Sequence, residues 1–312
     1  MMRLSFRFIP DNPTINFIGR RIIFFIFSAL LVTASIATFA TKGMNYGIDF
    51  TGGIMIELKT EKPDQISLLR ERLSGLGLGS VELQEFGAPD DILIRIQRQE
   101  GGEEAQQKAV ASAKEAMGDI VSEYRRTELV GPKVSNELYL NGIYAVLSAM
   151  LAILIYIWFR FEWQFGLAAV AALLHDVIST IGIFALLGLE FNLATVAAVL
   201  TIAGYSINDT VVVFDRVREN MRKYKVKPMD ELLNDSTNET LARTVVTGLT
   251  TLIALIALYS LGGSVIRDFS FAMIWGVIIG TYSSICVAVP MLLYMGKIRR
   301  SPDEETAEQT AP

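Results

Sequence analysis

The sequence has a single cysteine, Cys286, and a single histidine, His175, in 312 residues. One cysteine cannot form a disulfide within the chain. One histidine and one cysteine cannot supply the ligands of a zinc site of the HExxH or clustered Cys/His type, so zinc metalloproteases are excluded. The Gly-x-Gly-Asp motif of intramembrane aspartyl proteases is missing as well. We therefore expect no enzyme, no catalytic residue, no metal and no cofactor.

Charged residues are also scarce, at 20% of the chain against 51% hydrophobic residues. This balance is too apolar for one water-soluble domain, and the apolar residues gather in six long runs. Each run is close to the ~20 residues that a helix needs to cross about 30 Å of hydrocarbon. We predict a polytopic α-helical membrane protein with six transmembrane helices, at residues 22–40, 139–159, 165–187, 193–214, 241–261 and 269–295. The first run is longer than the roughly 7 to 15 apolar residues of a signal peptide, so we interpret it as a span.

Basic residues predict which side of the membrane each segment occupies. They are Arg3, Arg7, Arg20 and Arg21 before the first span, Arg160 between the second and third, six Lys/Arg residues in 216–227, and Lys297, Arg299 and Arg300 after the sixth. With six crossings all of them fall on one side, which should be cytoplasmic. We expect a cytoplasmic N-terminus (1–21), a cytoplasmic loop (215–240) and a disordered cytoplasmic tail (296–312), with no nucleic-acid partner.

The segment between the first two spans, residues 41–138, is predicted to lie on the opposite, periplasmic side as a small α+β domain. Strands are expected where Ile54, Ile56 and Leu58 alternate, over 81–86, around Ile92, and over 124–130, with helices after Pro63 and over 103–117. The resulting order, βαββαβ, is that of the ferredoxin-like arrangement. Without a catalytic cluster or a Gly-rich phosphate loop, a binding or mechanical role is the better prediction.

Two acidic residues lie inside the apolar runs, and a charge in hydrocarbon costs at least about 2.5 kcal/mol, so each is a candidate functional residue. Asp209 follows Tyr205 by one helical turn and Asn208 by one residue. In the fifth span Arg243 and Thr247 share one face, so two helices with matching polar faces can place Asp209 against Arg243. The alternative is that Arg243 extends to the interface and Asp209 only caps a packing site.

His175 and Asp176 lie near the middle of the third span. An interhelical hydrogen bond and a proton relay are equally good explanations for this pair. In the sixth span Gly276, Gly280 and Ser284 recur at every fourth position, which lets another helix approach closely and indicates packing.

Three motifs resemble the SecF family of protein-export membrane subunits. They are residues 47–53 (GIDFTGG), residues 130–132 (VGP) with Glu137 and Leu138, and residues 204–210 (GYSINDT) leading into 214–220 (FDRVREN). The order of six spans with one domain between the first two matches over nearly the whole chain. The SecF family belongs to the resistance-nodulation-division superfamily.

The resemblance implies a bacterial inner-membrane protein that acts with SecD, the SecYEG translocon and SecA. It would use the proton-motive force to promote the translocation and release of preproteins. On that pattern Asp209 and Arg243 match the acid and base of the proton path, with Thr247 one turn beyond. Asp49, Gly52 and Gly53 belong to a family signature for which glycine's backbone freedom suggests a hinge.

Two other functions remain compatible with the sequence. One is half of a proton-driven exporter of small molecules, since the superfamily includes such pumps. The other is a passive scaffold that holds SecD and the translocon together, in which Asp209 would be replaceable by asparagine.

Overall fold

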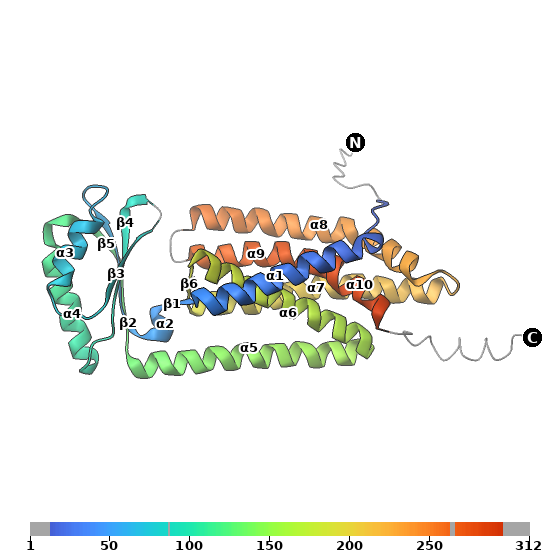
Figure 1. Cartoon of the computed structure of the whole chain (residues 1–312), viewed down its shortest axis with the longest axis horizontal. Helices are drawn as coiled ribbons and strands as arrows, with labels where there is room; N and C mark the ends of the chain where they lie inside the picture. The colour runs from blue at the N-terminus through green and yellow to red at the C-terminus, as the bar shows by residue number, and fades with distance from the viewer. Residues whose placement is uncertain (1–12, 87, 263–265, 296–312) are drawn as a thin grey trace, which may run out of the picture. The chain divides into compact units, whose positions relative to one another are not determined.

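The computed structural model describes residues 13–86, 88–262 and 266–295 (Figure 1). It divides into two compact units. The helical unit comprises Met1–Met44, Val146–Leu189 and Ala197–Pro312, and the α+β unit comprises Asn45–Ala145 and Glu190–Val196. Each is described by itself below.

Six helices of the described residues are long and apolar enough to cross a membrane. They are α1 (Arg21–Lys42), α5 (Pro132–Arg160), α6 (Trp163–Leu187), α7 (Leu193–Lys223), α8 (Met229–Leu261) and α9 (Arg267–Ser283). After α9 the last span continues through a π-helical segment, Ser284–Ala288, into α10 (Val289–Met291) and a 3₁₀ turn, Leu292–Tyr294. The prediction of a polytopic helical membrane protein is confirmed.

Several helices extend beyond the spans that the sequence predicts. α7 continues to Lys223 and α8 begins at Met229, so most of the predicted loop at 215–240 is helical. Likewise α5 begins at Pro132, seven residues before the predicted span. Charged side chains mark where the apolar run ends, but they do not end a helix. The predicted tail at 296–312 and residues 1–12 of the predicted N-terminus lie outside the described residues.

The helical unit packs around α6 and the last span, which are the most buried of the six. Its main core joins Phe165 of α6 with Phe214 of α7, both fully buried, and Leu233 of α8. α1 lies against α6, where a Cβ on Gly182 would meet the Ser35 side chain. The segment before α1 is held by amide side chains of α8, because Asn234 and Asn238 accept hydrogen bonds from the backbone of Phe17 and Ile15, both at 2.9 Å.

In the α+β unit, four strands form an antiparallel sheet. The elements are β2 (Gly53–Thr60), α3 (Ile66–Ser74), β3 (Val81–Phe86), β4 (Ala88–Ile96), α4 (Gly102–Met117) and β5 (Val121–Val130). The sheet order is β3-β4-β2-β5, and α3 and α4 cover one face of it (Figure 1). The alternating residues Ile54, Ile56 and Leu58 are buried under Leu69 of α3 and Met117 of α4.

The α+β unit also contains elements that the sequence analysis missed. A parallel pair joins β1 (Asn45–Tyr46) to β6 (Glu190–Phe191), and a short helix, α2 (Ile48–Thr51), follows β1. Arg95 of β4 ties the pair to the sheet, since it donates to Asn45 at 2.7 Å and to Glu190 at 2.5 Å. Two-residue strands are too short to leave a periodic pattern in the sequence.

Candidate functional site

Apart from Trp275 Nε1, four buried polar atoms on α7, α8 and α9 of the helical unit have no hydrogen-bond partner among the described residues. They are Tyr205 Oη and Asp209 Oδ2 of α7, Thr244 Oγ1 of α8 and Thr281 Oγ1 of α9. We call these four residues the Asp209 site. Buried polar groups are nearly always paired, so an unpaired group indicates a place for water or an ion.

The local sequence explains why Tyr205, Asp209 and Thr281 come close together. Tyr205 and Asp209 are four residues apart and therefore share one face of α7. On α8, Thr244 lies one turn before Gly248, whose missing side chain lets neighbouring helices approach. A Cβ on Gly248 would lie 3.5 Å from Thr281 Oγ1 and 4.0 Å from Tyr205 Oη. The glycine thus brings α7, α8 and α9 together at the site.

Asp209 is deeply placed, with 3% of the residue exposed. Its carboxyl group faces the Thr281 hydroxyl and lies within electrostatic range of Arg243. Within the described part of the chain, however, the two charges make no direct ion pair, and Arg243 is exposed on α8. Asp209 and Arg243 are thus close enough to interact electrostatically, but they do not form the predicted direct contact.

Two other predicted residues point elsewhere. The Thr247 hydroxyl donates to the carbonyls of Arg243 and Thr244, at 3.1 and 3.0 Å, as threonine does within a helix. Asn208 is exposed on α7, whereas the next residue, Asp209, is buried. Their roles in a proton path therefore gain no support from contacts with the carboxylate.

His175 and Asp176 form a second polar cluster deeper in α6. Asp176 is fully buried, and His175 Nδ1 lies 2.9 Å from its Oδ1. Its Oδ2 accepts hydrogen bonds from Ser206 of α7 at 2.5 Å and Ser283 of α9 at 2.8 Å. Both carboxylate oxygens are thus occupied, and one side chain joins three helices. His175 Nε2, by contrast, has no hydrogen-bond partner among the described residues, so Asp176 acts as an interhelical junction while a relay through His175 stays a prediction.

The small residues of the last span lie against α7. A Cβ on Gly276 would overlap the Ile202 side chain, and one on Gly280 would lie 3.1 Å from Ser206 Cβ. Ser284, the next member of the series, is more than a spacer, since its hydroxyl pairs with Thr210 at 2.8 Å. This close approach brings Thr281 opposite Asp209.

The predicted hinge residues occupy well-defined positions in the α+β unit. The Asp49 carboxylate accepts a hydrogen bond at 2.9 Å from the backbone N–H of Leu193, the first residue of α7. It thereby satisfies a free donor at the positive end of that helix. Gly52 and Gly53 have φ values of +70° and +126°, and a Cβ on Gly53 would lie 2.7 Å from the Ile96 carbonyl. Only glycine fits there, while a hinge motion stays a prediction.

Sequence reasoning missed Thr244 and Thr281. The sequence offers little indication of them, because threonines are common in these spans. It also does not show which residues of neighbouring helices lie opposite each other. No group of three or more His, Cys, Asp or Glu side chains gathers in the part of the chain that the structure describes.

Comparisons with known proteins identify the family. A family model described as protein export membrane protein SecD/SecF, C-terminal, matches residues 109–298, and one for the SecD/SecF GG motif matches residues 38–64. That second range contains Gly52 and Gly53.

Two curated relatives are protein translocase subunits SecF. The protein of Cereibacter sphaeroides is 43% identical, covering 99% of this chain and 98% of its own length. That of Magnetococcus marinus is 47% identical over 95% of this chain and 96% of its own.

A solved structure has the same fold over nearly the whole chain. The crystal structure of SecDF from Thermus thermophilus, a translocon-associated membrane protein, matches with a TM-score of 0.83 and 37% identity. The match covers 94% of this chain but only 39% of the SecDF chain. The six apolar helices and these matches together establish that the chain belongs to the SecF family of multi-pass bacterial inner-membrane protein translocase subunits.

Proposed function

We propose that this chain works with SecD to convert the proton-motive force into preprotein movement, with Asp209 as the residue that binds and releases the ion. The chain spans 39% of the SecDF chain, so the remainder of that assembly would come from a SecD partner. The SecYEG translocon and SecA complete the proposed set of partners. This is a transport role, and it requires no catalytic residue.

The observation that carries the proposal is the unpaired Asp209 Oδ2 among three unpaired hydroxyls. A carboxylate buried without a hydrogen bond is costly unless a proton, an ion or water reaches it. The Thr281 hydroxyl, which the carboxyl group faces, can hold such water. By contrast Asp176, whose oxygens are both occupied, has no such need.

Protonation of Asp209 would remove its attraction to Arg243 and allow α7 and α8 to change their packing. A proton that crosses 100 mV releases about 2.3 kcal/mol, enough to shift a two-state equilibrium about fiftyfold. This holds when uptake and release belong to different conformations. At the other end of α7, Asp49 holds the first residue of the helix, so a change in α7 acts on the GG-motif segment.

The proposal includes an orientation and a fold for the α+β unit. In this orientation both termini lie in the cytoplasm and the α+β unit lies in the periplasm, and the Lys/Arg-rich segments on one side of the spans support it. The strand order β3-β4-β2-β5, with antiparallel neighbours and two helices on one face, supports a ferredoxin-like arrangement.

The test compares Asp209→Asn, Arg243→Met and Thr281→Val in a strain depleted of the native subunit. We expect Asp209→Asn and Arg243→Met to insert and to bind SecD, yet to lose the export that depends on the proton-motive force. Thr281→Val keeps the shape of the side chain but removes a hydroxyl, so an intermediate loss is expected.

The matched control is Thr250→Val, which removes an exposed hydroxyl of α8 that bonds only to its own helix. Export should be unchanged in this variant. Full proton-dependent export with Asp209→Asn would refute the proposal and leave the scaffold function. A gain of drug sensitivity on depletion, without an export defect, would instead favour the small-molecule exporter.

A further inference from the structure

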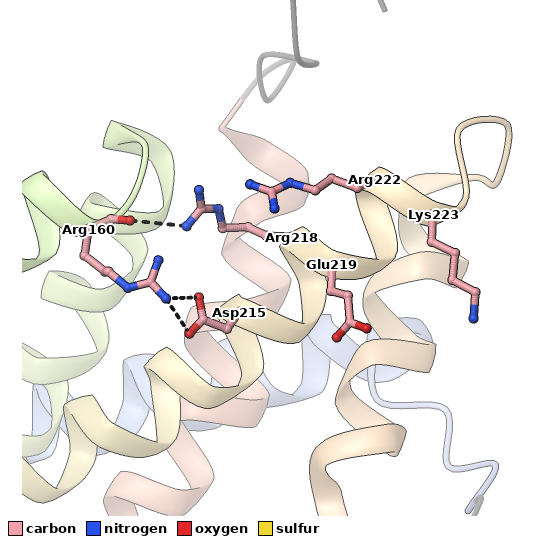
Figure 2. A pocket seen from close by; sticks show the side chains of 6 residues that line it. All are labelled: Arg160, Asp215, Arg218, Glu219, Arg222 and Lys223. Carbon is pink, nitrogen blue, oxygen red and sulfur yellow. Dashed lines mark hydrogen bonds and ion pairs between the residues drawn. The ribbon is translucent and has the colours of Figure 1, made fainter. Parts of the chain in front are cut away.

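A cavity of about 480 Å³ opens at the end of the helical unit where α5 meets α6 and α7 ends (Figure 2). Its lining residues are Arg160, Asp215, Arg218, Glu219, Arg222 and Lys223. The proposed ion path does not use it, although most of these residues belong to the FDRVREN motif or directly follow it.

The cavity has more positive charge than its own carboxylates neutralise. Asp215 is engaged by Arg160, whose Nη2 lies 2.9 Å from both carboxylate oxygens. Glu219 pairs with Arg216, which is not part of the lining, at 2.7 Å. Among the described residues, Arg218, Arg222 and Lys223 have no carboxylate within ion-pair distance. Three cations that line the cavity therefore lack a carboxylate partner among the described residues. Of these, Lys223 points away from the two arginines, with its Nζ 5.0 Å from the centre of the Tyr224 ring (Figure 2).

Two of the guanidinium groups pack against the same aromatic ring. Phe161, 5% exposed, lies under both Arg160 and Arg218, whose Cζ atoms are 5.1 and 5.3 Å from the ring centre. Arg218 also donates to the Arg160 carbonyl at 3.2 Å, and the Arg222 side chain extends toward Arg218 (Figure 2). The ring stabilises each guanidinium group, but the neighbouring positive charges repel one another, and a bound anion would offset that repulsion.

Exposed aromatic residues place the cavity at the surface of the bilayer. Trp158 and Phe159 precede Arg160, Trp163 follows it, and all three side chains are largely exposed. Tryptophan is enriched at the level of the lipid headgroups, where its apolar ring and N–H group contact the two environments. The cavity is thus flanked by side chains suited to acyl chains, whereas a free phosphate would have no use for them.

We propose that this cavity binds the phosphate group of an anionic phospholipid. The planar guanidinium group matches phosphate oxygens with two parallel hydrogen bonds, and Lys223 adds a point charge. Basic pockets between membrane helices on the cytoplasmic side suit such headgroups. The inference is independent of the ion path, because it concerns neither Asp209 nor export.

The test uses the full chain purified in a neutral detergent, with phosphatidylglycerol, cardiolipin, phosphatidylcholine or inorganic phosphate added. Lipid retention is measured by native mass spectrometry, and affinity by thermal stability against ligand concentration. Arg222→Gln and Lys223→Gln change exposed side chains, so the fold should persist. The matched control, Lys225→Gln, removes one exposed cation that does not line the cavity.

We expect the two anionic lipids to bind and to raise the melting temperature of the unaltered chain. Each of Arg222→Gln and Lys223→Gln should weaken this binding about fivefold, and Lys225→Gln should leave it nearly unchanged.

Equal loss in all three variants would overturn the proposal, and so would equal binding of phosphatidylcholine. Equal stabilisation by inorganic phosphate would overturn the lipid as occupant. Loss of SecD copurification in Arg222→Gln with unchanged lipid binding would assign the cavity to a protein contact instead.

Discussion

At the scale of single residues, the two buried acids of the membrane helices differ in what surrounds them. Asp176 is bonded by His175, Ser206 and Ser283, so it serves as a fixed junction between α6, α7 and α9. Asp209 faces the Thr281 hydroxyl, and its Oδ2 has no hydrogen-bond partner among the described residues. Both stood out in the sequence as charges inside apolar runs, but only their partners distinguish them. Apart from His175, those partners lie on other helices, and the sequence does not show how the helices align with one another.

A residue-scale prediction concerns Asp119 in the α+β unit. Arg72 Nη1 donates to its Oδ1 at 2.6 Å, and this hydrogen bond holds the pKa of Asp119 below its ordinary value of 3.8. The stabilisation is therefore complete above pH 3.8 and is lost as the pH falls through the lower pKa of the folded state. We expect acid to loosen the contact between α3 and the Asp119 turn, measured by hydrogen–deuterium exchange of these segments below pH 4.

Asp119→Asn supplies the comparison for that measurement. It lacks the ionised acceptor, so its exchange should depend less on pH over the acid range. Glu104→Gln, which removes an exposed acid of α4 without an ion pair in the described chain, should behave like the unaltered protein. An identical acid response in all three proteins would contradict the prediction.

At the scale of elements, the small residues of the last span determine how closely α9 approaches α7. We predict that Gly276→Ala destabilises the helical unit by about 1–3 kcal/mol, because the new methyl group overlaps Ile202. Thermal unfolding in detergent measures the effect. Adding Ile202→Ala should recover part of the loss by making room for the methyl group.

Gly204→Ala is the matched control within the same pair of helices. A Cβ there would meet nothing within 4 Å, so only helix propensity changes and stability should stay level or rise by up to about 1 kcal/mol. If Gly276→Ala and Gly204→Ala melted alike, the close approach of α7 and α9 would not be what stabilises the unit.

The regular elements were largely predictable, and the irregular ones were not. The 20-residue apolar runs indicated all six helices, and the alternation of Ile54, Ile56 and Leu58 indicated β2. The sequence analysis did not predict the helix ends, the β1–β6 pair or the π-helical segment at 284–288. They depend on contacts between distant segments and on Pro290, which has no N–H to continue regular α-helical hydrogen bonding.

At the scale of the whole molecule, the distribution of basic residues predicts that both termini and the 224–228 turn face the cytoplasm. The single native cysteine is buried, so Cys286→Ala provides a background for labelling. In that background Glu104→Cys should react with an impermeant maleimide in spheroplasts. Lys225→Cys should react only after the inner membrane is permeabilised. Labelling of Lys225→Cys in intact spheroplasts would reverse the proposed orientation.

The unbroken course of α7 has a mechanical consequence. Its 31 residues make a rod about 46 Å long, and Asp209 lies about 24 Å from the end at Leu193. A tilt of about 5° pivoting at Asp209 therefore displaces Leu193 by about 2 Å, a shift long enough to break a hydrogen bond. If Asp209 binds the ion as proposed above, the length of α7 would convert a small tilt at the carboxylate into a larger displacement of Leu193, the hydrogen-bond donor to Asp49.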